Sequence, residues 1–357
     1  MKTKRTWTDF ILKEWLLLAA ATGFVLTSGY LKQLPSYSVQ EYEVLFILFS
    51  LFVVVKGLEH SGLISRISYT LEKGRAVPLK LIVATLLLSM LITNDAALIV
   101  LVPLTLMLNI KHKDILVILE ALAANAGSAL TPFGNPQNLF IYWYYNLSPG
   151  EFISTIAPFT VLFAILLILS TLLIRTKRIP ETSQKTKKVE YSAYIYGALL
   201  ILVLLVVLRI LPVYAAALVF IYVLIFERKS LFIDYSLILS FFFFFGVAEN
   251  LKVFLGTHFE HPGHIFLFSV ASSQVMSNVP AALLFAKLTT QWKALLWGTN
   301  VGGFGSLIGS FANLIAYKLY INNNETNHIV SFTTKFLLLG YLAFFIGIGL
   351  YFFFGAP

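Results

Sequence analysis

Two short polar motifs interrupt long apolar stretches of this sequence. TNDAAL, residues 93–98, places Thr93, Asn94 and Asp95 between runs of Leu, Ile and Val. SNVPAAL, residues 277–283, repeats the pattern with Ser277 and Asn278. Hydroxyl and amide groups donate and accept hydrogen bonds, and a carboxylate binds a cation or a proton. Because such groups are costly inside a bilayer, the motifs predict a ligand or ion site there.

Two longer motifs, rich in Gly and Asn, follow the polar tips. NAGSALTPFGNPQNL at 125–139 aligns without gaps on NVGGFGSLIGSFANL at 300–314, at a constant separation of 175 positions. The matched pairs are Asn125 with Asn300, Gly127 with Gly302, Thr131 with Ser306, Gly134 with Gly309, Asn138 with Asn313, and Leu139 with Leu314. Gly and Pro break a helix, which frees carbonyls that suit a cation and exposes helix N-termini that suit an anion.

These four motifs supply the candidate substrate-binding and ion-binding residues. They are Thr93, Asn94, Asp95, Asn125, Thr131, Gly134, Asn135, Asn138, Ser277, Asn278, Asn300, Ser306, Gly309 and Asn313. The regions around Asn94 and Gly134, and around Asn278 and Gly309, are candidate Na⁺ sites. We expect no catalytic residue and no cofactor beyond a coupling ion, H⁺ or Na⁺.

The elements that carry these residues are predicted to be membrane helices. The 357 residues are 58% hydrophobic and 12% charged, far more apolar than a soluble domain. The chain has no Cys, which excludes disulfides and thiolate chemistry.

Two charged residues lie in apolar segments: Lys287 is expected to extend outward to the interface, and Glu120 either reaches the cytosolic interface or serves the site.

The distribution of basic residues predicts the topology. Placing the N-terminus in the cytosol and the C-terminus outside gives about nine full crossings. It leaves only five of the 26 Lys and Arg residues outside, as the positive-inside rule requires. Segments 80–109 and 264–291 are predicted to be re-entrant hairpins, since each limb of the first is too short to cross the bilayer. Segments 114–145 and 293–320 are predicted to be broken helices.

The matched motifs divide the chain into two halves, 1–180 and 191–357, joined by a basic cytosolic linker at 181–190. One hairpin enters from the cytosol and the other from outside, so the all-α fold is predicted to be an inverted repeat. Inverted repeats with paired broken helices indicate a secondary transporter whose site lies at the bilayer midplane.

At these residues the chain resembles the ion transporter superfamily, which includes citrate transporters, arsenite-efflux permeases, NhaD-type sodium/proton antiporters and divalent-anion:sodium symporters. TNDAAL and SNVPAAL stand where that superfamily has its hairpin tips, and GNPQNL stands at its first helix break. The resemblance implies a scaffold subdomain, a mobile transport subdomain, elevator-type movement and often a homodimer. The dicarboxylate symporters carry Ser-Asn-Thr at both tips, whereas Asp95 and Val279 stand third here, which argues against a dianionic substrate.

The sequence therefore predicts an ion-coupled secondary transporter of a small anion or oxyanion-like solute in the cell membrane. Its expected partners are a small inorganic or organic anion, the lipid bilayer and a second copy of the chain, without nucleic acid. Na⁺/H⁺ antiport and arsenite efflux are the alternatives within the same class. A channel or an intramembrane enzyme is the alternative from a different class.

Overall fold

Helices form all of the regular structure that the computed structural model describes. It describes residues 14–63, 66, 76–107, 112–174, 189–255, 260–323 and 329–355, and these contain fifteen α-helices and no strand. Most of the predicted linker at 181–190 lies outside these residues. The α-helices are α2 (Trp15–Leu31), α3 (Val39–His60), α5 (Val77–Leu91), α6 (Asn94–Met107), α7 (Lys113–Ser128), α8 (Pro136–Tyr144), α9 (Pro149–Thr171), α10 (Ser192–Val207), α11 (Ala217–Phe226), α12 (Tyr235–Leu255), α13 (Pro262–Met276), α14 (Asn278–Ala286), α15 (Trp292–Gly302), α16 (Phe311–Ile321) and α17 (Ile329–Leu350).

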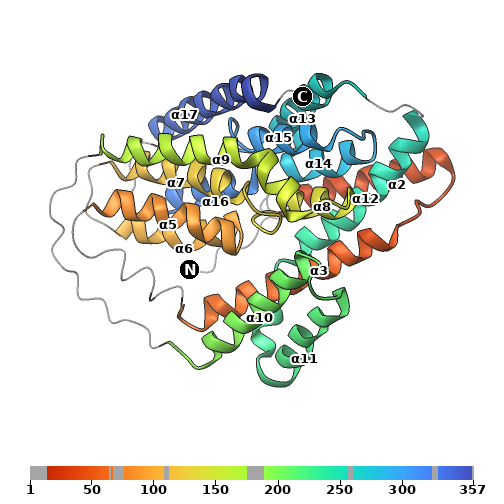
Figure 1. Ribbon diagram of the computed structural model, residues 1–357, viewed down its shortest axis with the longest axis horizontal. Coiled ribbons are helices and arrows are strands. Elements are labelled where there is room, and N and C mark those ends of the chain that lie inside the picture. Colours follow the sequence, from red (N-terminus) through yellow and green to blue (C-terminus); the bar gives the residue numbers. More distant parts are fainter. Residues whose placement is uncertain are drawn as a thin grey trace, which may run out of the picture.

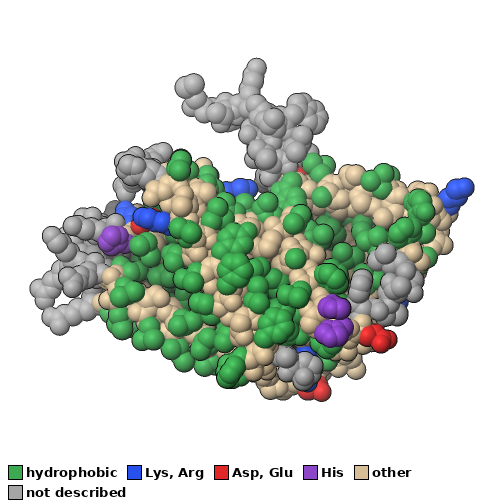
Figure 2. All heavy atoms as spheres, turned by 90° about the horizontal axis from the view of Figure 1, so that it is seen from above, with side chains coloured by type: hydrophobic (Ala, Val, Ile, Leu, Met, Phe, Trp, Pro, Cys, Tyr) green, Lys and Arg blue, Asp and Glu red, His purple; other side chains and the backbone are tan. Residues whose placement is uncertain are grey.

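The longest apolar helices fit a membrane interior. Segments Pro149–Thr171, Tyr235–Phe254 and Ile329–Phe354 are long and apolar enough to cross a bilayer, and five shorter apolar helices accompany them. Figure 2 shows one face covered largely by hydrophobic side chains, with most of the visible charged groups near its periphery. The expected all-α membrane protein is therefore confirmed at this level.

The helices group into a large bundle and a smaller set beside it. In Figure 1 the helices α5 to α9 and α13 to α17 lie together, with α3, α10 and α11 beneath them and α2 and α12 at one side. In the large bundle α5 packs on α7 and α13 on α15, while α6 packs on α16 and α14 on α8. In the other set α2 packs on α12 and α3 on α10. In the large bundle these four contacts form two matching pairs, with one hairpin and one broken helix of each half taking part in each pair.

The polar motifs fall between helices. α5 ends at Leu91 and α6 begins at Asn94, while α13 ends at Met276 and α14 begins at Asn278, so each predicted hairpin range holds two short helices joined at its polar tip. The predicted broken-helix ranges likewise hold α7 and α8, and α15 and α16. Small residues allow the broken helices to approach the hairpins, because a β-carbon at Gly127 would collide with Ser89 and one at Gly302 with Ser273.

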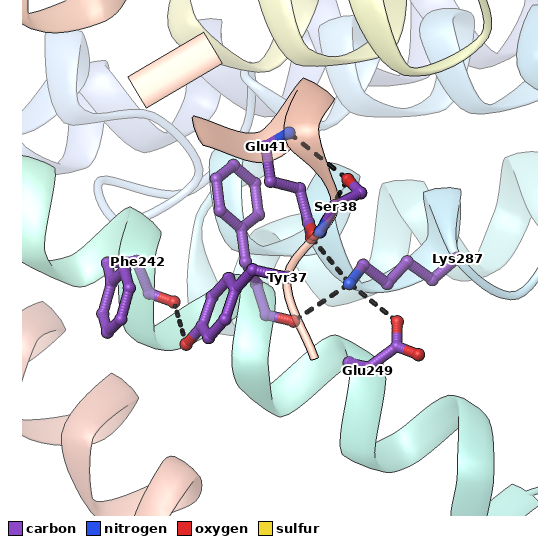
Figure 3. A network of polar contacts seen from close by, with 7 residues as sticks. Tyr37, Ser38, Glu41, Phe242, Glu249 and Lys287 are labelled. Atoms are coloured by element: carbon purple, nitrogen blue, oxygen red, sulfur yellow. Dashed lines mark hydrogen bonds and ion pairs between the residues drawn. The ribbon is translucent and has the colours of Figure 1, made fainter. Parts of the chain in front are cut away.

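The expectation for Lys287 was wrong, and of the two alternatives for Glu120 the structure excludes the interfacial one. Lys287 does not extend outward: its side chain is 3% exposed and forms ion pairs with Glu41 and Glu249 (Figure 3). Glu120 does not reach an interface, since it is fully buried and accepts a hydrogen bond of 2.6 Å from Thr105 Oγ1. In both cases a polar partner on another helix contacts the charged group inside the protein, although Glu120 Oε2 has no hydrogen-bond partner among the described residues.

Candidate functional site

The two hairpin tips contact the two helix breaks through the same backbone hydrogen bond. The amide of Asn94 donates to the carbonyl of Gly134 at 3.0 Å, and the amide of Asn278 donates to the carbonyl of Gly309 at 2.9 Å. These bonds join a hairpin of each half to the broken helix of the same half. They also mean that both carbonyls of the expected Na⁺ regions already accept one hydrogen bond.

Asparagine side chains connect the two breaks to each other. Asn125 Nδ2 donates to Asn313 Oδ1 at 2.8 Å, and Asn300 Nδ2 donates to Asn138 Oδ1 at 2.9 Å. Asn94 Nδ2 extends the chain of bonds to Asn125 Oδ1 at 3.3 Å. All five side chains are buried. The sequence-matched asparagines therefore form a pair of crossed contacts at the centre of the bundle.

The same asparagines satisfy the backbone that the breaks leave without helical hydrogen bonds. Asn138 Nδ2 donates to the carbonyls of Ser128 and Ala129 at 3.3 and 3.1 Å. Asn313 Nδ2 donates to the carbonyls of Gly303 and Ser306 at 2.9 and 3.0 Å. Lipid offers no hydrogen bonds, so irregular backbone at this depth requires such partners.

Hydroxyl groups bind the breaks to the first limb of each hairpin. Thr131 Oγ1 donates to the carbonyl of Met90 at 2.7 Å, and Ser306 Oγ donates to the carbonyl of Gln274 at 3.1 Å. At the first tip, Thr93 Oγ1 accepts the amide of Ala96 and so caps α6. These hydroxyls hold the hairpins and breaks in register.

Ser277, at the second tip, has an unusual backbone. Its φ of 74° and ψ of 156° place it in a region of backbone conformation that residues other than Gly rarely adopt. It is 2% exposed, and Thr93 at the matching position has no positive φ. Strain of this kind persists only where the surroundings fix the conformation, and the bond between Asn278 and Gly309 does so here.

Capping residues complete the start of the second helix at each break. Asn135 Oδ1 accepts the amide of Asn138 at 3.1 Å and its Nδ2 donates to Ser128 Oγ, so it caps α8. Ser310 caps α16 in the same way through the amide of Ala312 at 3.3 Å. The motif comparison named Asn135 but missed Ser310, because the two caps differ in residue type.

Four helix N-termini meet at one small cavity. Its volume is about 10 Å³, room for about one water molecule. The lining residues include Asn94 and Asp95 of α6, Pro136 and Gln137 of α8, Asn278 and Val279 of α14, and Ser310 and Phe311 beside α16. Each helix N-terminus carries about half a positive charge, so the four together favour an anion. The two tips thus share one cavity, as expected from the sequence.

Asp95 lies between this cavity and a larger one. The second cavity, of about 200 Å³, is also lined by Asp95, together with Lys56, Glu59 and Asp234. Asp95 is partly buried, and its Oδ1 has no hydrogen-bond partner in the described part of the chain. Its carboxylate is therefore placed to bind a cation or a proton next to the shared cavity.

The sequence motifs did not identify Gln274 as a site residue. Its side-chain Nε2 donates to the carbonyls of Gly302 and Phe304 at 2.8 and 3.1 Å, and its Oε1 accepts the amide of Ser306 at 2.8 Å. It joins the first limb of the second hairpin to the second break. The available signal was the one amide side chain in a hairpin limb whose other polar residues within the helix are a histidine and three serines.

Comparison with known proteins identifies the family. The sequence profile described as citrate transporter matches residues 7–297. The chain belongs to the citrate transporter family. This membership fits the expected ion transporter superfamily.

Individual relatives agree with this family. The chain is 34% identical over 341 residues to the uncharacterized transporter MJ0456 of Methanocaldococcus jannaschii, covering 91% of this chain and 92% of that protein. It is 31% identical over 307 residues to the inner membrane protein YbiR of Escherichia coli, covering 78% and 80%. A shorter match, 34% over 131 residues, is to the silicon efflux transporter LSI3 of Oryza sativa subsp. japonica, covering 34% and 27%.

Family membership and the helical structure define the general function. This member of the citrate transporter family is a multi-pass protein of the cell membrane and a secondary transporter. It is not an enzyme, so the alternative of an intramembrane enzyme is set aside.

Proposed function

We propose that this protein is an ion-coupled secondary transporter of a small anion or oxyanion-like solute. The convergence of four helix N-termini on one cavity between the hairpin tips carries the proposal, because it provides positive potential without a fixed basic side chain. Asn94 and Asn278 supply neutral hydrogen-bonding groups at the same place.

We propose further that the two halves form an inverted repeat, with re-entrant hairpins α5–α6 and α13–α14 and about nine crossings. The matched contacts support this arrangement: a tip-to-break bond occurs once in each half, at Gly134 and at Gly309, and the two crossed asparagine pairs join equivalent positions of the two halves. In this view the large bundle is the mobile transport subdomain and α2, α3, α10, α11 and α12 form the scaffold, within a homodimer.

The small cavity volume indicates that solute binding requires movement. A space for one water molecule is too small for an oxyanion, so a tip must separate from its break before the solute enters. The bonds of Asn94 to Gly134 and of Asn278 to Gly309 are the ones that would open. Opening would also free the two carbonyls for Na⁺.

Asp95 is proposed to bind the coupling ion, either H⁺ or Na⁺. A carboxylate next to the solute would repel a multiply charged anion but would offset the charge of a bound cation. Efflux of an arsenite-like oxyacid is the second candidate. The match to a silicon efflux transporter favours it over Na⁺/H⁺ antiport, since silicon and arsenic both form small hydroxylated solutes.

Reconstitution into liposomes tests the proposal. Uptake and efflux of citrate, phosphate, arsenite and silicic acid would be measured with imposed Na⁺ or pH gradients. We expect one of these solutes to accumulate against its gradient. Asp95→Asn should lower gradient-driven accumulation at least tenfold while the protein remains folded.

Asp234→Asn is the matched control, because Asp234 lines the larger cavity but not the cavity between the tips. It should retain most of the accumulation. Full accumulation by Asp95→Asn under both gradients would contradict the role of Asp95. Conductance far above carrier turnover would instead indicate a channel.

A further inference from the structure

A buried ion cluster joins the second hairpin to two helices outside the large bundle (Figure 3). Lys287 Nζ lies 2.6 Å from Glu41 Oε1 and 2.9 Å from Glu249 Oε2, and it also donates to the carbonyl of Phe245 at 3.3 Å. The side chains of Lys287 and Glu41 are 3% and 2% exposed, and that of Glu249 is 24% exposed. We call Lys287, Glu41 and Glu249 the ion triad.

The ion triad is rigidly connected to the solute site. Lys287 is the C-cap of α14, and Asn278 is the first residue of the same helix. A helix of nine residues is about 13 Å long, so the triad holds the end of α14 opposite the tip. Glu41 is itself fixed, because its Oε2 accepts from the amide and hydroxyl of Ser38 in the capping box of α3.

The ion triad and the larger cavity lie at opposite ends of the same two helices. Glu41 is in the first turn of α3 and Glu249 is near the end of α12. The cavity beside Asp95 is instead lined by Lys56 and Glu59 near the end of α3, and by Leu237 near the start of α12. At one end of α3 and α12, the ion triad holds α14 against both helices. At the other end, the larger cavity reaches Asp95.

We infer that the ion triad is a gate that closes the solute site on the side opposite the cavity. This inference rests on the proposed transport function and on its alternating access. For α14 to move away from α3 and α12, Lys287 must leave both carboxylates, and separated charges at such depth lack compensation. The intact triad therefore favours the conformation observed, which on the predicted topology is open to the cytosol and closed to the outside.

The other hairpin has no basic residue at the position that matches Lys287. At the separation of 184 positions that aligns Asn94 with Asn278, Lys287 corresponds to Pro103 in α6. The ion triad is therefore a property of one hairpin and not a general requirement of the repeated fold. This asymmetry is expected of a gate that acts on one side of the membrane only.

Thiol labelling tests the gate without knowledge of the solute. The chain contains no Cys, so Val279→Cys places a single thiol on the cavity between the tips. The labelling rate by a membrane-impermeant maleimide would be measured from each side of sealed vesicles. With the triad intact we expect labelling mainly from the cytosolic side. With Lys287→Met and Glu41→Gln combined, we expect labelling from the outside to rise at least fivefold.

The matched control is Lys335→Met, which removes an ion pair with Asp114 inside the large bundle. It should leave both labelling rates unchanged. A charge exchange that also removes Glu41, Lys287→Glu with Glu249→Lys and Glu41→Gln, restores one ion pair between α14 and α12. It should return outside labelling toward the starting rate, and it tests the gate if the first variant does not fold. Unchanged side preference in the folded variants would overturn the gate, even if the liposome assays with Asp95→Asn support transport.

Discussion

Asn125 and Asn313, which are 188 positions apart in the sequence, share a buried hydrogen bond of 2.8 Å. Its counterpart joins Asn300 to Asn138 at 2.9 Å. Because each acceptor side chain also donates to carbonyls of its own break, the pair links the two irregular segments into one polar network. A fully satisfied network of this kind fixes a unique geometry.

We expect Asn313→Ala to destabilise the protein by roughly 2–4 kcal/mol. The substitution leaves the carbonyl of Gly303 without its side-chain donor, at about 1–3 kcal/mol for a buried group left unsatisfied. It also removes one of the hydrogen bonds of the Ser306 carbonyl and of the Asn125 side-chain amide, which keep their bonds to Gly309 and Ala121. Thermal unfolding of the purified protein in detergent would measure the loss. Asn322→Ala, at an exposed residue after α16, is the control and should change stability by less than about 0.5 kcal/mol. Equal stability of the two variants would argue against the network.

Ser277→Gly is expected to stabilise the protein. A positive φ with an extended ψ costs a non-Gly residue about 1–3 kcal/mol, and Gly removes most of that cost. Gly also makes the unfolded chain more flexible, which lowers stability by about 0.5–1 kcal/mol. The net gain should be on the order of 1 kcal/mol in a chemical or thermal unfolding measurement. If Ser277 also binds solute, transport should fall although stability rises.

Thr93→Gly is the matched comparison at the other tip. Thr93 has no positive φ and caps α6 through Ala96, so Gly should remove a cap and add flexibility. We expect a loss of about 1 kcal/mol. A gain of stability for Ser277→Gly together with a loss for Thr93→Gly would confirm that backbone strain is confined to the second hairpin. Stability changes of the same sign for both variants would refute it.

A double substitution tests the role of Glu120. Thr105→Val removes the donor to a fully buried carboxyl whose Oε2 already lacks a partner among the described residues. We expect a loss of roughly 1–3 kcal/mol. Adding Glu120→Met should recover most of it, because replacing both polar partners with apolar groups is nearly neutral.

The activity of the same variants separates structure from transport. If Glu120 only packs between α6 and α7, the double variant should transport at close to the wild-type rate. A stable double variant without gradient-driven transport would show instead that Glu120 takes part in ion coupling. Both measurements use the liposome assay described for Asp95→Asn.

Residue type and position predicted much of this structure. The apolar composition gave the membrane class, and the polar tips and Gly-rich motifs marked where helices end, since Asn94 and Asn278 begin α6 and α14. These signals are local, because a polar residue or a helix breaker acts on the chain around it. All fourteen candidate residues lie at the tips, at the breaks or beside them, while their role in binding remains a prediction.

The contacts between distant segments could not be predicted in this way. Gln274 serves carbonyls 28 and 30 positions away, and Lys287 pairs with Glu41 from the other half of the chain. A single polar residue in an apolar helix indicates that it has a partner but not which one. The sequence allowed Lys287 either to extend to the interface or to pair with a carboxylate on another helix. Extension to the interface was expected because it avoids burying a charge.

The position of Lys287 also has an electrical consequence. If α14 moves along the membrane normal while Glu41 and Glu249 stay behind, Lys287 contributes one positive charge to the charge that moves through the membrane field. A full crossing would be worth about 2.3 kcal/mol per 100 mV, and a partial crossing a corresponding fraction. A negative interior would draw this charge inward, so the membrane voltage would itself favour the cytosol-open form and make the return step of the cycle voltage-dependent.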